Sequence, residues 1–143
     1  METYALLLAA TLNAGTVLAL AALGLLINEK SGIVNLGAEG MMLCAAVAGF
    51  AAVVHTGHDS LGFLAGMAAG GLLAALFGVL VIWLNTNQYA TGLALSLFGA
   101  GFSAFVGVPY VQARLPERVA FEVPGLADVP FIGPALFQQH PMV

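Results

Sequence analysis

The 143-residue chain is 61% hydrophobic and only 7% charged, with a mean hydropathy of +1.01, whereas soluble domains are roughly 45 to 50% apolar and about 25% charged. Seven Asp/Glu and three Lys/Arg residues are too few to cover a soluble fold of this size, so lipid is the expected solvent. Three basic residues also cannot neutralise a phosphate backbone, which excludes nucleic acid as a partner.

This composition predicts an all-α integral membrane protein with four transmembrane helices in residues 1–108. The first helix covers residues 5–27, which contain no ionisable group. At 1.5 Å per residue it is about 35 Å long, enough for a bilayer core of about 30 Å. The length of this run, and Glu2 in place of a basic start, argue against a cleavable signal peptide.

The second predicted helix, residues 33–54, follows a polar break at residues 28–32. Asn35 and Glu39 interrupt it, and they share one helical face if the segment is regular. The segment also contains three glycines, and those near its start are compatible with a broken or partly unwound beginning. The glycines are Gly37, Gly40 and Gly49.

The third predicted helix, residues 61–84, carries a small residue at every fourth position. That spacing puts the small residues in one stripe, where the backbone of another helix can approach closely. We expect this stripe to pack helices together. Its members are Gly62, Gly66, Gly70, Ala74 and Gly78.

The fourth predicted helix, residues 89–108, follows a polar turn at residues 85–88 and carries a small, weakly polar stripe. The stripe either lines a solute path or packs against the glycine stripe of the third helix, and packing is the favoured interpretation. Thr91 lies one turn from the first member. The members are Gln88, Gly92, Ser96, Gly99 and Ser103.

The chain changes character at residue 109, because all six prolines lie from there onward. Residues 109–143 are predicted to be an irregular, Pro-rich tail outside the membrane. Four crossings place the 28–32 break and the 85–88 turn on one side of the membrane. The positive charges, Lys30 against Arg114 and Arg118, are too few to orient the protein.

Glu39 is the sharpest anomaly in the apolar segments. A charged side chain near a helix centre costs about 2.5 to 3.5 kcal/mol on insertion scales, so it should face protein or water. A structural hydrogen-bonding role and a place on a solute path are equally favoured for it. For Asn35, bracing of a neighbouring backbone is favoured over contact with a solute.

Catalytic and cofactor motifs are absent from the sequence. His55 and His58, beside Asp59, have a spacing loosely compatible with a metal ion, but a solvated loop is the favoured interpretation. Cys44 is expected to be a packing residue. We therefore predict no catalytic residue, no metal site and no cofactor.

Two runs of residues resemble one transporter family. The first is Glu29-Lys30-Ser31-Gly32-Ile33-Val34-Asn35-Leu36-Gly37-Ala38-Glu39-Gly40-Met41-Met42-Leu43, and the second is Asn87-Gln88-Tyr89-Ala90-Thr91-Gly92-Leu93-Ala94-Leu95. They are similar to the permease subunits of bacterial ATP-binding-cassette importers for nucleosides and simple sugars, relatives of the ribose and branched-chain amino acid permeases. The stretch Gly133-Pro134-Ala135-Leu136-Phe137 resembles the extracytoplasmic loop of that family.

The resemblance implies a multi-pass protein of the bacterial inner membrane whose partners are a second permease subunit, ATP-binding-cassette ATPase subunits and a solute-binding protein. ATP hydrolysis would reside on the ATPase partners, so the chain itself would not be an enzyme. The resemblance also implies that residues 28–32 are cytoplasmic and that the Pro-rich loop is extracytoplasmic. Asn35, Glu39, Gln88 and Thr91 are the expected residues near the solute path.

The chain is about half as long as permeases of this kind, so we expect it to correspond to their amino-terminal half, from a truncated gene, a split gene or an incomplete sequence. The rival hypothesis is a small non-transport membrane protein whose glycine stripes assemble a helical bundle with a scaffold role. An intramembrane enzyme ranks third, because no paired acid and base are present.

Overall fold

The computed structural model describes residues 2–113, which consist of helices and short connections. In chain order they are α1 (Glu2–Lys30), α2 (Ala38–Thr56), α3 (Asp59–Gly78), a π-helical turn (Val79–Trp83), α4 (Gln88–Gly107) and a 3₁₀ turn (Val108–Tyr110). Among residues 2–113, four helices are long and apolar enough to cross a membrane, which confirms the predicted all-α class with four spans. Most of the predicted Pro-rich tail lies outside the described residues.

The second helix starts later than predicted. Residues 33–35 have no regular structure and residues 36–37 form a turn, so α2 begins only at Ala38. The partly unwound beginning that the glycines suggested is therefore present. At the end of α3 the helix continues into the π-helical turn and reaches Trp83.

The chain divides into two compact units, one containing residues 1–24 and the other residues 25–116, and each is described by itself. Most of α1 belongs to the first unit. The hydroxyls of Thr11 and Thr16 donate to the carbonyls of Leu7 and Leu12, each at 2.8 Å. These two polar side chains are thus satisfied by their own helix, which suits a helix in an apolar solvent.

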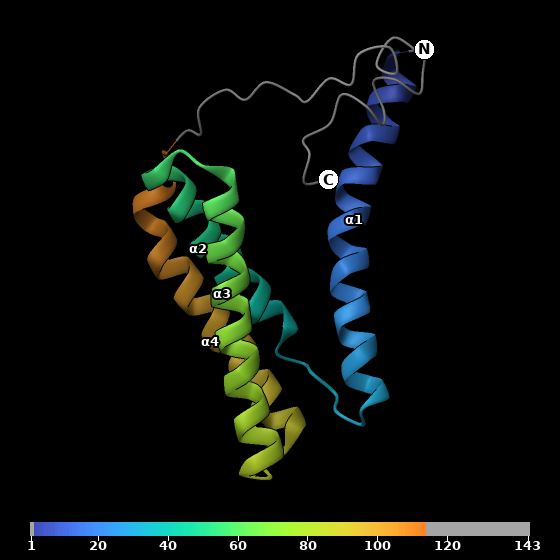
Figure 1. Ribbon diagram of the computed structural model, residues 1–143, viewed down its shortest axis with the longest axis vertical. Helices are drawn as coiled ribbons and strands as arrows, with labels where there is room; N and C mark the ends of the chain where they lie inside the picture. The colour runs from blue at the N-terminus through green and yellow to red at the C-terminus, as the bar shows by residue number, and fades with distance from the viewer. Residues whose placement is uncertain (1, 114–143) are drawn as a thin grey trace. The chain divides into compact units, whose positions relative to one another are not determined.

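The second unit is built on α2, which contacts both α3 and α4, whereas α3 and α4 contact each other only sparsely. Figure 1 shows the three helices side by side. The chain reverses between α2 and α3 and again between α3 and α4. Consequently α2 runs antiparallel to α3 and parallel to α4.

Glycines bring α2 and α3 together at backbone distance. A β-carbon on Gly49 would lie 3.0 Å from the Gly62 carbonyl oxygen, and one on Gly66 would lie 3.1 Å from the Ala45 oxygen. A β-carbon on Gly70 would reach only ordinary contact with the Ala45 side chain, at 3.5 Å. This part of the α3 stripe faces α2, and close packing of this kind is how helices associate in lipid.

The α3 stripe does not continue along the whole helix. Ala74 is exposed, and a β-carbon on Gly78 would meet nothing within 4 Å among the described residues. The stripe therefore contacts α2 through its first three members. Its last two members have no helix against them in this unit.

The small stripe of α4 packs against α2, and not against the α3 stripe as the sequence analysis favoured. A β-carbon on Gly40 of α2 would lie 2.5 Å from the Leu95 carbonyl oxygen and 2.7 Å from the Ser96 Cα. A β-carbon on Gly99 would in turn collide with the Gly40 backbone. The periodicity located the small face of α4 correctly but assigned the wrong neighbour to it.

Candidate solute-path site

The non-helical stretch before α2 begins where α1 ends. Gly32 has φ +85°, a left-handed conformation that favours glycine, and its backbone N–H donates to the Glu29 carbonyl at 3.0 Å. The next N–H, of Ile33, donates to the Asn28 carbonyl at 3.0 Å. Such a left-handed glycine ends a helix by turning the chain away while satisfying its last carbonyls.

Two amide side chains satisfy backbone N–H groups of this stretch. The Val34 N–H donates to Gln88 Oε1 at 3.0 Å, and the Gly37 N–H donates to Asn35 Oδ1 at 2.9 Å. Backbone at membrane depth must be hydrogen-bonded within the protein or face water. The two amides therefore stabilise residues 33–37 in a conformation that supplies few backbone bonds of its own.

Gln88 and Asn35, two of the predicted path residues, are thus brought to the same short stretch of chain. Gln88 is the first residue of α4, and both side chains are partly buried. The Asn35 Nδ2 group contacts the Met41 sulfur at 3.7 Å, a weak interaction. Each amide oxygen acts as a brace for the backbone, the role that the sequence analysis favoured for Asn35.

Glycines allow the stretch to lie directly on α4. A β-carbon on Gly92 would lie 2.9 Å from the Leu36 N and 3.1 Å from the Gly37 N. A side chain at position 92 would therefore push residues 36–37 away from the helix. Beside this contact lies the small hydrophobic core of the unit, made by Met41, Phe77 and Leu95.

Thr91 is placed one turn into α4 but is engaged with the preceding loop. Its Oγ1 lies 2.9 Å from the Thr86 Oγ1, and the Thr86 hydroxyl donates to the Leu80 carbonyl at 2.8 Å. Asn87 caps α4, because its Oδ1 accepts from the N–H groups of Tyr89 and Ala90 at 3.0 and 3.1 Å. These bonds fix the turn between the π-helical end of α3 and the start of α4.

Glu39 lies apart from the side-chain amides of Asn35 and Gln88. Because Asn35 lies before the first residue of α2, it does not share a helical face with Glu39, contrary to the expectation for a regular helix. Glu39 is exposed in the first turn of α2. Its neighbour Gly40 is level with Leu95 and Ser96 of α4, which places Glu39 about 10 Å beyond the first residue of α4 along the bundle.

His55 and His58 do not form a metal site with any other described residue. Within residues 2–113, no group of three or more His, Cys, Asp or Glu side chains is arranged to hold a metal ion. The Nδ1 atoms of His55 and His58 lie 2.8 Å from the carbonyl oxygens of Ala51 and Thr56. Cys44 is buried, and its thiol donates to the Gly99 carbonyl at 3.7 Å.

One feature of the bundle was not anticipated from the sequence. Tyr110, just past α4, makes edge-to-face contacts with Phe50 and His55 of α2, at ring-centroid distances of 6.3 and 5.8 Å. This aromatic cluster joins the ends of the two parallel helices, far from the amide pair. No local pattern connects Phe50 to a residue 60 positions later, so periodicity could not find it.

Comparison with known proteins matches residues 7–122 to a family described as "Branched-chain amino acid transport system / permease component". The chain is similar to the "Putative glucose ABC transporter permease protein TsgC13" of Haloferax volcanii, with 43% identity over 96% of this chain and 43% of the relative. It is also similar to the "Guanosine ABC transporter permease protein NupQ" of Bacillus subtilis, with 30% identity over 96% of this chain and 46% of the relative.

A third relative is the "Nucleoside ABC transporter permease protein NupC" of Lactococcus lactis, with 28% identity over 97% of this chain and 47% of the relative. The chain therefore spans less than half of the length of the curated relatives that it matches. No solved structure matches it.

Proposed function

This chain belongs to the family of permease components of branched-chain amino acid transport systems, and from that premise we propose that it forms part of the solute path of an ATP-driven importer for nucleosides or simple sugars. It is a multi-pass membrane protein, and its relatives are named as transporter permeases. The scaffold alternative finds no support among them. The proposed location is the bacterial inner membrane.

The proposed partners are a second permease subunit, two ATPase subunits and a solute-binding protein. ATP hydrolysis would take place on the ATPase subunits, and this chain would respond by moving helices. The proposed orientation places residues 28–32 in the cytoplasm. The chain would correspond to the amino-terminal half of a full permease, because its relatives are more than twice as long as the matched region.

The observation that carries the proposal is the non-helical stretch before α2, held by Gln88 from α4. Broken helices at membrane depth are a recurrent way for transporters to expose polar groups to a solute. Here the polar groups that would meet the solute are the amide nitrogens of Asn35 and Gln88, the Thr91 hydroxyl and, about 10 Å further along the bundle, the Glu39 carboxylate. Neutral solutes rich in hydroxyls suit a path with amides, hydroxyls and one acid.

Uptake of labelled guanosine and glucose tests this function in cells that express the full permease with its ATPase and binding protein. Glu39→Leu is expected to abolish uptake, because the carboxylate would meet the solute. Glu29→Leu removes an exposed acid at the end of α1 and is the matched control, expected to leave uptake unchanged. Normal uptake with Glu39→Leu would remove Glu39 from the path, and no uptake of either solute by the unmodified complex would refute the proposed function.

A further inference from the structure

α2 has a third face that neither α3 nor α4 covers. Glu39, Leu43, Ala46 and Phe50 follow one another at spacings of four, three and four residues, so they form one stripe. The stripe lies opposite Met41, which is buried in the core. Glu39, Leu43 and Ala46 are exposed, and Phe50 is partly buried.

The carboxylate at one end of this stripe requires a polar neighbour. The Glu39 carboxylate makes no hydrogen bond or ion pair with any residue among 2–113, and the residue lies about 10 Å in from the start of α4. At that depth an ionised group does not face acyl chains; it faces protein or a water-filled space. A helix that covered Glu39 would therefore have to place a hydrogen-bond donor or a cation opposite it.

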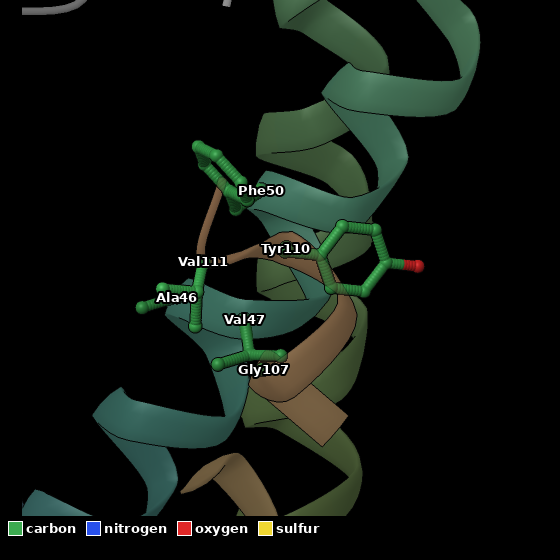
Figure 2. A pocket seen from close by; sticks show the side chains of 6 residues that line it. All are labelled: Ala46, Val47, Phe50, Gly107, Tyr110 and Val111. Atoms are coloured by element: carbon green, nitrogen blue, oxygen red, sulfur yellow. The ribbon is translucent and has the colours of Figure 1, made fainter. Parts of the chain in front are cut away.

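The other end of the stripe borders an apolar cavity, which we call the socket. Ala46 and Phe50, with Val47, Gly107 and Val111, line a cavity of about 340 Å³ beside Tyr110. Figure 2 shows Val111, from the segment after α4, beside Ala46 and Phe50 of α2. The lining is apolar, so it suits a large apolar side chain and offers little to a polar solute.

We infer that this face of α2 is the docking site of a transmembrane helix from the remaining part of the full permease, which places a donor opposite Glu39 and, about 16 Å away, a large apolar side chain in the socket. The inference rests on the proposed function, because the covering helix belongs to the full permease which that function assumes. The relatives are more than twice as long as the matched region, so further chain exists in them to provide this helix.

A second copy of the chain fits this face poorly. Two copies related by an axis along the membrane normal would bring their Glu39 carboxylates to the same depth, one against the other. The stripe carries no cation or donor side chain to separate them. Like charges in a poorly solvated contact are unfavourable. The helix that covers this face is therefore not the same face of a second copy.

Site-specific photo-crosslinking in the assembled, full-length importer tests the inference. A benzophenone side chain is placed at Leu43 or Ala46, and at Leu97 as the control, because Leu97 is 76% exposed on the side of α4 away from α2. We expect crosslinks from positions 43 and 46 to peptides of the same permease outside residues 1–143. Position 97 is expected to give no such peptide.

A second variant probes the socket without removing the carboxylate. Ala46→Trp fills the socket and is expected to reduce the position-43 crosslink at least about fivefold, the change that follows from an overpacking cost of about 1 kcal/mol. An unchanged crosslink, or crosslinks only to lipid, to α1 or to a second copy, would overturn the inference.

The outcomes separate this inference from the proposed function. Crosslinks as expected, together with normal uptake by Glu39→Leu, would keep the docking face and remove Glu39 from the path. Lipid crosslinks at positions 43 and 46, together with lost uptake by Glu39→Leu, would refute the docking face and keep Glu39 on the solute path.

Discussion

Gly40 of α2 and Gly99 of α4 are packed backbone against backbone, so that a β-carbon on Gly99 would collide with the Cα, carbonyl carbon and oxygen of Gly40. The Cys44 thiol donates to the carbonyl of the same Gly99 one turn along α2. Apolar side chains gain nothing by moving from lipid into a contact between helices. Such close backbone approach is therefore a principal source of helix association in a membrane. This contact is therefore among those that hold α2 and α4 together.

Replacing Gly99 by alanine should therefore destabilise the bundle by about 1 to 3 kcal/mol, since the added methyl group has backbone on its far side and no flexible neighbour to move. Thermal unfolding of the full permease in detergent measures the effect. Gly101→Ala is the matched control on the same helix, because a β-carbon there meets nothing within 4 Å among the described residues. Equal midpoints for the two variants would contradict the predicted packing.

Substitution of the α3 stripe glycines by leucine should disrupt the bundle where the stripe contacts α2 and should be tolerated where it does not. Gly66→Leu is expected to separate α3 from α2, because even a β-carbon at position 66 would lie 3.1 Å from the Ala45 oxygen, whereas Gly78→Leu should be tolerated within this bundle. Folding yield and melting temperature after purification in detergent compare the two. A larger loss with Gly78→Leu would indicate that another helix covers that end of α3.

Gln88→Leu should release the stretch before α2. Loss of the acceptor leaves the Val34 N–H unsatisfied, which typically costs about 1 to 3 kcal/mol for a buried donor. Hydrogen–deuterium exchange at Val34 in nanodiscs should become faster. Gln88→Glu keeps an acceptor oxygen and should preserve protection. Slow exchange that persists in Gln88→Leu would show that the bond at 3.0 Å is not what protects this amide.

Asn87→Ala should weaken the start of α4 by about 1 kcal/mol, because it removes the side chain that accepts from the Tyr89 and Ala90 N–H groups. Asn87→Asp retains the capping oxygen and serves as the control. Melting temperatures of the two variants give the comparison. If both variants melt like the unmodified protein, the cap contributes nothing to stability.

The helices could be predicted from the sequence because long runs without charge have few alternatives in a membrane protein. Hydropathy could not locate the start of α2, since Ile33, Val34 and Leu36 are apolar whether or not they are helical. Their conformation depends in part on a hydrogen bond to Gln88, 54 residues later. That pairing depends on how the helices pack, and no local pattern contains it.

The same limit applies to the candidate site. Asn35 was identified as a polar residue in an apolar run, and periodicity identified Gln88 and the small face of α4. Neither signal could say which helix faces that stripe or that Asn35 and Glu39 are separated by the start of α2. The Tyr110 cluster was missed for a similar reason. Its partners are distant in sequence, and aromatic residues near a helix end are common in membrane proteins.

The central position of α2 has a consequence for biogenesis. Because α3 and α4 scarcely touch each other, each depends on α2 for an interface, and α2 is made before both. When α3 and α4 leave the ribosome, the helix on which each docks is thus already inserted. A circularly permuted chain that began at α3 would place two helices in the bilayer without a shared partner, exposed to quality-control proteases until α2 arrived.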